Sequence, residues 1–236
     1  VPFDFRMKSR NGEMNEKLGQ TISDLIKVTP KGTGVLCFFT SYGFMNSCLL
    51  SWTNNRLLSE IEKSKEIFKD QQNSTAKNIV KNFNDSCANN KHSNKKGGVL
   101  FSVLRGSSSE GIDFSDDKAR MVIVVGIPYP NLGDIKVNLK KEYLEEYLRN
   151  PTRNQNIKVR GNEWYENCAI KSVNQALGRV IRHANDYGTM VLIDSRYNGG
   201  QIERKFSKWI RDNLKYYGDK SILEETKMFF SNIEGK

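Results

Sequence analysis

Residues 121–127 read MVIVVGI, an apolar run in which hydrophobic side chains do not alternate with polar ones. Continuous hydrophobicity over so short a length is typical of a strand buried on both faces of a parallel sheet. Three further runs of the same kind occur along the chain: GVLCFF at 34–39, GVLFSVL at 98–104 and TMVLID at 189–194. The sequence therefore predicts a mostly parallel sheet that contains these strands.

Segments with apolar residues at helical spacing lie between the four runs. We expect helices over about 14–28, 43–58, 74–88, 135–148, 163–183 and 202–214. Strands that alternate with helices indicate a doubly wound layer, because the crossover helices cover both faces of a parallel sheet. The predicted fold class is therefore α/β.

Length and composition favour one folded domain. The chain has 236 residues, of which 37% are hydrophobic, and it shows no convincing linker. A polar stretch over 69–96, rich in Asn, Lys and Ser, is expected to be a surface excursion that holds one short helix. The net charge of +10 favours polyanionic partners through counterion release, although dispersed, solvated lysines explain the same excess.

Cysteine and histidine spacing predicts neither disulfides nor a metal site. The cysteines form no C-x-x-C pair, so we expect free thiols at Cys37, Cys48, Cys87 and Cys168. No zinc-ligand spacing can be built with His92 and His183. The apolar runs fall far short of the roughly 20 residues that cross a membrane. We expect a soluble protein of a reducing compartment, and the first residue, Val1, without a signal-peptide pattern, suggests a segment of a longer chain.

Polar residues follow each predicted strand, where open α/β sheets bind their ligands. Thr40, Ser41 and Tyr42 come after the run at 34–39. Two hydroxyls and an aromatic ring can hold a phosphate oxygen and offer a stacking face. The local alternative is that Thr40 or Ser41 caps the next helix.

The loop RGSSSEGIDF at 105–114 follows the run at 98–104. Its glycines and hydroxyls suit backbone amides that meet phosphate, while a carboxylate can accept from a ribose hydroxyl or an arginine. A plain loop with a salt bridge is the alternative. The two remaining strand ends favour structural uses: a stiff, proline-rich turn with a packing Tyr129, and an ion pair between Asp194 and Arg196.

The stretch QALGRVIR at 175–182 is predicted to lie on the helix over 163–183. At about 100° per residue, Gln175, Arg179 and Arg182 would share one polar face. Arginine keeps its charge at working pH, and its forked donors suit a transferring γ-phosphoryl group. A solvated polar face is the competing interpretation.

Some expected phosphate-binding motifs are absent from the sequence. The chain contains no G-x-x-x-x-G-K-[ST] loop and no acidic Asp-Glu-x-His run, so it has arginines for phosphate without a phosphate cradle. This asymmetry suggests half of a composite site, with the other half on another domain. We therefore expect the isolated chain to have almost no ATPase activity.

Four stretches together resemble motifs of one family, the iron–sulfur, DEAH-type branch of superfamily 2 DNA helicases. VLCFFTSY at 35–42 resembles motif IV, RGSSSEGIDFSDD at 105–117 motif V, GIPYPN at 126–131 the turn after it, and NQALGRVIRH at 174–183, with the next strand, motif VI. Each motif is weak alone, but all four occur in the right order at strand ends. The resemblance covers nearly the whole chain and implies the second RecA-like motor domain, a fold of the P-loop NTPase type.

The resemblance also implies roles for individual residues. Arg179 and Arg182 would act as arginine fingers on ATP, with Gln175 orienting them or contacting the γ-phosphate. The residues expected to line the nucleotide are Glu110, Gly111, Asp113 and Gly178. The residues expected to grip single-stranded DNA are Thr40, Ser41, Tyr42, Arg105, Ser107 and Ser109. Ser107 departs from the family, which usually has Lys there, so a charge-assisted phosphate contact is in doubt or is supplied by Arg105.

Cofactors and partners follow from the same resemblance. ATP and Mg²⁺ would be shared with an N-terminal motor domain of the same polypeptide, and a [4Fe–4S] cluster would be bound outside this chain. The resemblance implies single-stranded or forked DNA as substrate, 5′ to 3′ movement, and work in the nucleus in DNA repair or genome maintenance. The alternatives are a non-catalytic basic module that binds nucleic acid, and a Rossmann-type dinucleotide enzyme or methyltransferase. The latter is disfavoured because Gly32 and Gly34 precede their strand instead of following it.

Overall fold

The structure, a computed structural model, describes residues 3–6, 12–72, 76–87, 96–106, 114, 116–149, 159–183, 185–198, 200–217 and 219–234. Several candidate site residues lie outside these ranges, namely Ser107, Ser109, Glu110, Gly111 and Asp113, and so does His92.

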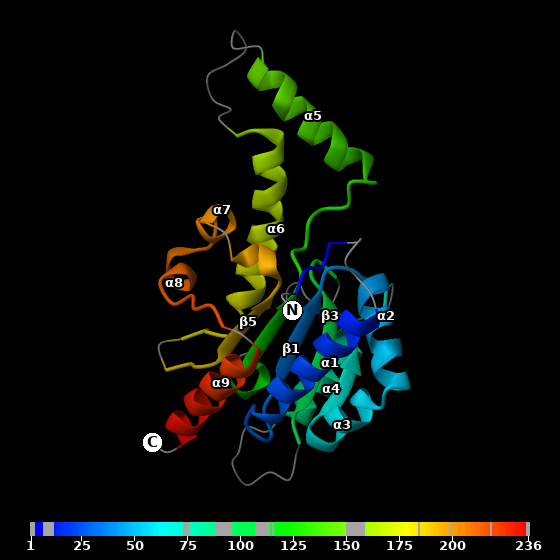
Figure 1. The fold of residues 1–236 in the computed structure, drawn as a ribbon, viewed down its shortest axis with the longest axis vertical. Coiled ribbons are helices and arrows are strands. Elements are labelled where there is room, and N and C mark those ends of the chain that lie inside the picture. Colours follow the sequence, from blue (N-terminus) through cyan, green and yellow to red (C-terminus); the bar gives the residue numbers. More distant parts are fainter. Residues whose placement is uncertain are drawn as a thin grey trace.

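A parallel sheet of five strands forms the centre of the molecule, in the order β2-β3-β1-β4-β5 (Figure 1). The strands are β1 (Val35–Phe39), β2 (Glu66–Lys69), β3 (Gly98–Val103), β4 (Met121–Val125) and β5 (Thr189–Ile193). All four predicted strands are present, and the α/β class is confirmed. The edge strand β2 is not among the predicted strands because its four residues, EIFK, include only two apolar ones, and both are half-buried.

The helices of the described chain are α1 (Gly12–Lys27), α2 (Tyr42–Asn54), α3 (Leu57–Ser64), α4 (Ala76–Ser86), α5 (Ile135–Arg149), α6 (Gly161–Leu177), α7 (Gly200–Glu203), α8 (Lys208–Arg211) and α9 (Asp219–Glu234). The predicted helix over 43–58 is wrong in its extent, because α2 and α3 are separate and Arg56 between them has a φ of 60°. The predicted helix over 202–214 is likewise divided into α7 and α8, and α9 is not predicted.

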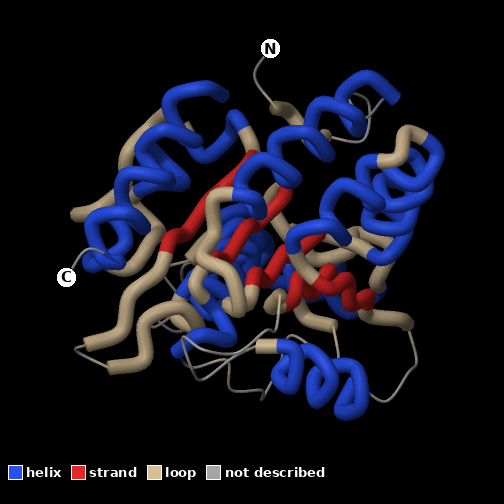
Figure 2. Tube along the Cα trace, turned by 90° about the horizontal axis from the view of Figure 1, so that it is seen from below, coloured by secondary structure: helices blue, strands red, loops and turns tan. Residues whose placement is uncertain are grey.

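Helices cover both faces of the sheet (Figure 2), which explains why the strand sequences do not alternate. On β1, Val35, Cys37 and Phe39 pack in the core cluster that includes α1 and α2. The intervening Leu36 and Phe38 pack in a second cluster with α4 and α6. Each face of the sheet therefore has its own hydrophobic core.

The polar stretch over 69–96 contributes buried residues to the second of these clusters, the one with α4 and α6. Helix α4 is present as predicted, and its Phe83 is fully buried against Phe68 of β2, with ring centroids 5.8 Å apart. The helix is therefore an integral part of the layer that covers the sheet. Residues 73–75 and 88–95 of this stretch lie outside the described ranges.

The four cysteines are free thiols, as predicted, and three of them are buried. Among the described residues, no helix is both long and apolar enough to cross a membrane.

Helix α5 and the first half of α6 project beyond the carboxyl ends of the strands (Figure 1). Two stacked rings join this projection to the sheet: Tyr129 after β4 and Tyr165 on α6 have centroids 5.1 Å apart and are inclined by 14°. The hydroxyl of Tyr165 also donates to the carbonyl oxygen of Pro130 at 2.8 Å. The packing role predicted for Tyr129 is therefore confirmed.

Candidate functional site

The predicted site residues are divided between two edges of the sheet. Because every strand pairs in parallel, the amino ends of the strands share one edge, and the carboxyl ends share the opposite edge. Thr40 and Arg105 follow β1 and β3, so they lie at the carboxyl edge. Arg182 lies at the amino edge, where its backbone N–H donates to Asp186, three residues before β5 begins. The segment that begins with α6 and continues to Arg182 connects the two edges.

The prediction that Gln175, Arg179 and Arg182 share one helical face is wrong. Helix α6 ends at Leu177, with Gly178 as its C-cap. Arg179 follows in a turn, and Arg182 lies in a segment without regular secondary structure. The physical reason is tertiary packing. Val180 is fully buried in the core cluster that contains α4 and α6. It approaches Gly188 so closely that a Cβ on Gly188 would lie 2.3 Å from Val180 Cγ1. Gln175 is exposed on the last turn of α6, Arg179 is half-buried, and Arg182 is exposed.

A buried ion pair fixes the turn that carries Arg182. Asp186 Oδ2 accepts from the backbone N–H of Arg182 at 3.0 Å, and Asp186 Oδ1 accepts from Arg120 Nη1 at 2.7 Å. The side chain of Arg120 is 7% exposed and that of Asp186 is fully buried. The guanidinium also lies over the ring of Tyr187, 3.9 Å from its centroid. The backbone at Arg182 is thus tied to the start of β4.

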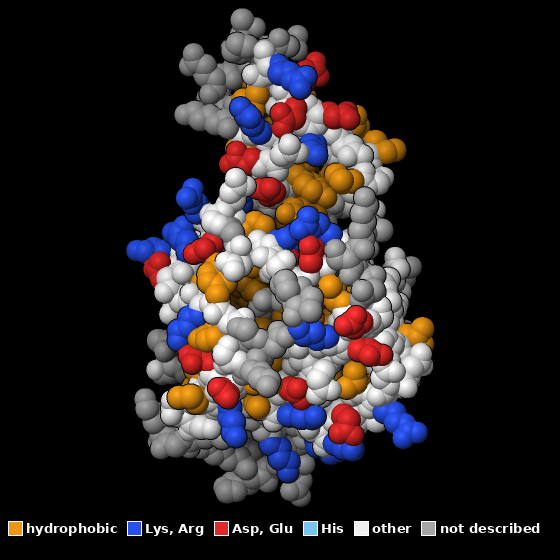
Figure 3. Space-filling view, in the orientation of Figure 1, with side chains coloured by type: hydrophobic (Ala, Val, Ile, Leu, Met, Phe, Trp, Pro, Cys, Tyr) orange, Lys and Arg blue, Asp and Glu red, His pale blue; other side chains and the backbone are white. Residues whose placement is uncertain are grey.

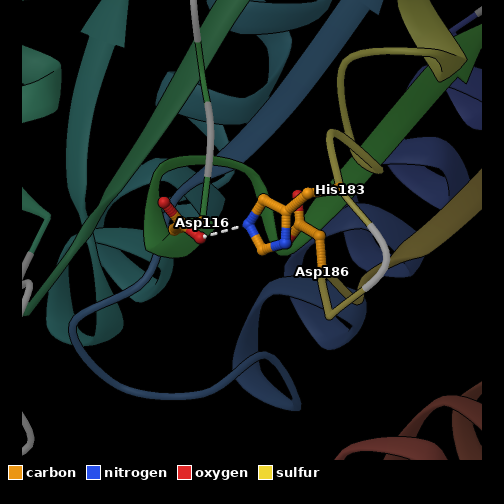
Figure 4. A group of neighbouring side chains, drawn as sticks. All are labelled: Asp116, His183 and Asp186. Atoms are coloured by element: carbon orange, nitrogen blue, oxygen red, sulfur yellow. Dashed lines mark hydrogen bonds and ion pairs between the residues drawn. The ribbon is translucent and has the colours of Figure 1, made fainter.

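His183 extends this network, as Figure 4 shows. Its Nε2 lies 3.0 Å from Asp116 Oδ1, and one ligand atom from each of Asp116, His183 and Asp186 lies within 4.8 Å of the others. This grouping has the donor types of a metal site. However, both oxygens of Asp186 already accept hydrogen bonds, one of them from the Arg120 guanidinium, so a cation there would have to displace a positive charge. The arrangement is better suited to holding the turn.

At the carboxyl edge, the hydroxyls after β1 have distinct partners. Ser41 Oγ accepts from the backbone N–H of Phe44 at 3.2 Å, so the capping alternative is confirmed for Ser41. Tyr42 donates its hydroxyl to Asp70 Oδ2 at 3.0 Å, and Ser102 Oγ donates to the same oxygen at 3.0 Å. Asp70 is fully buried, and its Oδ1 has no hydrogen-bond partner among the residues that the structure describes. A buried carboxylate thus joins the ends of β1, β2 and β3.

Arg105 points away from this group and toward α6. Its Nε donates to Ser172 Oγ at 2.6 Å, and its Nη2 donates to the carbonyl oxygen of Cys168. Gly106 packs on the other side, where a Cβ would lie 2.8 Å from the Tyr42 hydroxyl oxygen and 3.2 Å from Asp70 Oδ2. Arg105 therefore contacts α6, and Gly106 lies against the Asp70 group.

The last strand end forms the predicted ion pair. Arg196 Nη2 lies 2.6 Å from Asp194 Oδ2, and the carboxylate is fully buried. The guanidinium also lies 5.8 Å from the ring centroid of Tyr129. Charges elsewhere are spread out: on the face that Figure 3 shows, Lys and Arg side chains are interspersed with Asp and Glu.

Comparison with known proteins assigns the family. The model of the helicase C-terminal domain matches residues 22–213. The chain belongs to the helicase C-terminal domain family. It is 41% identical over 236 residues to the regulator of telomere elongation helicase 1 homolog of Drosophila sechellia, and the match covers 95% of this chain and 23% of that protein. It is 36% identical over 234 residues to the ATP-dependent DNA helicase CHL1 of Scheffersomyces stipitis, covering 98% of this chain and 27% of that protein.

Two solved structures share the fold. A chain described as XPD helicase matches with a TM-score of 0.55 at 21% identity, covering 86% of this chain and 32% of that one. The Xpd4 protein of S. tokodaii matches with the same score at 15% identity, covering 88% and 35%. The chain thus spans about a quarter of the length of the curated relatives and about a third of the solved chains.

The sequence pattern does not predict the roles of two residues near the carboxyl edge of the sheet, Asp70 and Ser172. Asp70 is the acidic residue directly after β2, and the weak apolar signal of that strand hides its position at a strand end. Ser172 lies 67 residues from Arg105 in the sequence, and only the packing of α6 brings the two together.

Proposed function

We propose that this chain is the second motor domain of an ATP-dependent DNA helicase of the iron–sulfur, DEAH-type branch. Membership in the helicase C-terminal domain family is the observation that carries this proposal. The names of the relatives, a telomere elongation helicase homolog and an ATP-dependent DNA helicase, agree with it. The absence of a Walker-type phosphate loop from the sequence fits a domain that completes an ATP site on the preceding motor domain.

In this proposal the amino edge faces ATP. Arg179 and Arg182 contact the γ-phosphate as arginine fingers, and Gln175, on the last turn of α6, orients them. The buried pair of Arg120 and Asp186 supports this role, because it fixes the backbone that carries Arg182 before a nucleotide binds. Preorganised positive charge stabilises a phosphoryl transition state without reorganisation during the reaction. Glu110, Gly111, Asp113 and Gly178 are proposed to complete the lining of the Mg²⁺-nucleotide site.

The carboxyl edge then holds single-stranded DNA. The hydroxyl of Ser41 accepts from Phe44 N–H, so its own proton can be donated to a phosphate oxygen. Arg105 offers charge at the next strand end, and Thr40, Tyr42, Ser107 and Ser109 are the further proposed contacts. Contacts to phosphate carry no sequence information, as a translocating motor requires.

Finer properties are part of the same proposal. Movement from 5′ to 3′, a [4Fe–4S] cluster on the preceding part of the polypeptide, forked DNA as substrate and a nuclear role in DNA repair or genome maintenance all derive from the family resemblance. Within the branch, the stretches EWYE at 163–166, NQALGR at 174–179 and SKWIR at 207–211 resemble the Fanconi anaemia group J helicase. The branch's helicases of telomere maintenance and sister-chromatid cohesion are the alternatives. Determining the upstream sequence tests the assignment to this branch and the cluster, since a P-loop, a DEAH box and four clustered cysteines are expected there.

The decisive test uses the complete polypeptide with Arg179→Ala and Arg182→Ala. We expect DNA-stimulated ATP turnover to fall by on the order of 10³-fold, with single-strand affinity largely kept. Arg149→Ala, which removes an exposed arginine at the far end of α5, is the charge-matched control and should leave turnover unchanged. The rival, a basic module without ATP chemistry, predicts weakened DNA binding with intact ATPase activity, and that result would reject our proposal.

A further inference from the structure

Arg105 makes an unusual connection between the end of a strand and a helix remote in sequence. Its Nε donates to Ser172 Oγ at 2.6 Å, and its Nη2 donates to the carbonyl oxygen of Cys168, one turn earlier on α6. Ser172 is buried, whereas Arg105 is exposed. The guanidinium thus ties the end of β3 to the middle of α6 from the surface of the molecule.

The backbone at this point is held in a specific conformation. Arg105 has a φ of 66°, in the left-handed region that costs a residue with a Cβ about 1–2 kcal/mol. Gly106 leaves no room for a side chain, because a Cβ would lie 2.8 Å from the Tyr42 hydroxyl oxygen. Such strain persists only where the surroundings impose it. The bonds of Arg105 therefore hold the end of β3 and α6 in one fixed arrangement. A displacement of the backbone at Arg105 would move α6 with it.

The chemistry of the guanidinium leaves room for a second partner. Arginine has five N–H donors, and described residues accept from two of them. The remaining donors suit phosphate oxygens, which arginine binds with its planar fork. One exposed side chain can therefore hold a nucleic-acid phosphate and α6 at the same time.

Helix α6 leads from the bonds of Arg105 toward the other edge of the sheet. Ser172 is followed by Val173, Ala176 and Leu177, which are all buried. At a rise of 1.5 Å per residue, Leu177 lies about 8 Å along the helix axis from Ser172. Gly178 and Arg179 follow Leu177 directly, so a displacement of the helix at Ser172 would reach them. A helix with a buried face moves as a unit, so the position of Arg179 depends on where the Arg105 bonds hold α6.

We infer that Arg105 is a positioning residue that transmits DNA occupancy to the arginine-bearing turn, through its bonds to Ser172 and Cys168. This inference rests on the proposed function, since it presupposes DNA at one edge and ATP at the other. It assigns Arg105 two simultaneous partners instead of a phosphate contact alone, and it gives the buried Ser172 a role in coupling without contact to DNA.

The experiment uses the complete polypeptide and three variants: Arg105→Ala, Arg105→Lys and Ser172→Ala. For each, basal ATPase rate, maximal ATPase rate at saturating oligo(dT) and the Kd for oligo(dT) are measured. Ser172→Ala should keep the basal rate and the Kd within about twofold while the maximal stimulation falls several-fold. Arg105→Lys keeps a charge for phosphate but loses the fork that bonds to α6, so its maximal stimulation should also fall several-fold.

Arg105→Ala should lose both affinity and stimulation, and the double variant with Ser172→Ala should have no lower maximal stimulation than Arg105→Ala alone. Normal maximal stimulation in Ser172→Ala would overturn the inference and leave Arg105 as a DNA contact only. A proportional fall in basal and stimulated rates, with reduced unfolding temperature, would also overturn it and indicate a structural tie. The proposed function is tested separately, because its failure appears in Arg179→Ala and Arg182→Ala whatever these variants do.

Discussion

The two edges of the sheet bury charge in different ways. At the amino edge, the buried cations have several partners within the chain: Arg120 contacts two carboxylates and a carbonyl, and Lys65 donates to the carbonyl oxygens of Pro30 and Thr33 at 2.8 Å each. At the carboxyl edge, Asp70 is fully buried with one oxygen that has no partner among the described residues. The buried cations of the amino edge are therefore bonded within the chain. At the carboxyl edge, Asp194 is likewise paired with Arg196, and the difference lies in Asp70, whose Oδ1 is an unused acceptor among the described residues.

The largest expected effect comes from breaking the amino-edge ion pair. Arg120→Ala leaves the fully buried Asp186 carboxylate without its cation, which should lower the free energy of unfolding by about 3–5 kcal/mol. Denaturant titration measures this loss. Lys63→Ala is the control: it breaks a pair with Glu60 whose side chains are 70% and 46% exposed, and it should cost less than about 1 kcal/mol. Similar losses of unfolding free energy in both variants would show that the buried pair contributes no more to stability than the exposed pair.

The second prediction concerns pH and Lys65. Burial lowers the pKa of Lys65 from 10.5 to about 8. Between these values the unfolded chain binds more protons than the folded chain, so the destabilisation is fully present below pH 8 and is relieved as the pH rises toward 10.5. The free energy of unfolding of the wild type, relative to Lys65→Met, should therefore rise by about 2–3 kcal/mol between pH 7 and pH 10.

Comparison with this variant is necessary because other groups titrate in the same range. Burial raises the pKa of the Cys37 and Cys87 thiols, and both residues are present in the two proteins. The contribution of Cys37 cancels in the difference between wild type and Lys65→Met, and that of Cys87 cancels except for its coupling to Lys65, whose charge lowers the pKa of this thiol. A difference that stays constant with pH would show that Lys65 keeps an ordinary pKa in the folded chain.

At the carboxyl edge, removing one donor to Asp70 should have a smaller effect. Tyr42→Phe deletes the hydroxyl bonded to the buried carboxylate, and we expect a loss of about 1.5–3 kcal/mol. In a background of Asp70→Asn, which removes the charge, the same change should cost less. Denaturant titrations of both single variants and the double variant form the cycle. Equal costs of Tyr42→Phe in the two backgrounds would argue against a charge-assisted bond.

The smallest effect is expected at the end of α6. Gly178 has a φ of −65°, which any residue can adopt, so Gly178→Ala should change stability by less than about 1 kcal/mol. Val180→Ala removes two buried methyl groups and should cost about 2 kcal/mol. If Gly178→Ala were instead the more damaging of the two in thermal or denaturant unfolding, glycine and not the burial of Val180 would set the end of the helix.

The sequence by itself determined the elements whose signal is local. The runs at 34–39, 98–104, 121–127 and 189–194 predicted four of the strands, because burial on both faces requires continuous hydrophobicity. The pair of Asp194 and Arg196 was equally accessible, since its members are two residues apart. Helix existence was predicted better than helix boundaries.

Only the tertiary structure decided the features that depend on distant contacts. Strand β2 has too few apolar residues to be recognised, and its pairing with β3 supplies the missing stabilisation. The end of α6 follows from the packing of Val180 against Gly188, so the shared helical face of Gln175, Arg179 and Arg182 was wrong. The bond between Arg105 and Ser172 spans 67 residues, and periodicity cannot encode a contact at such separation because it reports only which face of each element is buried.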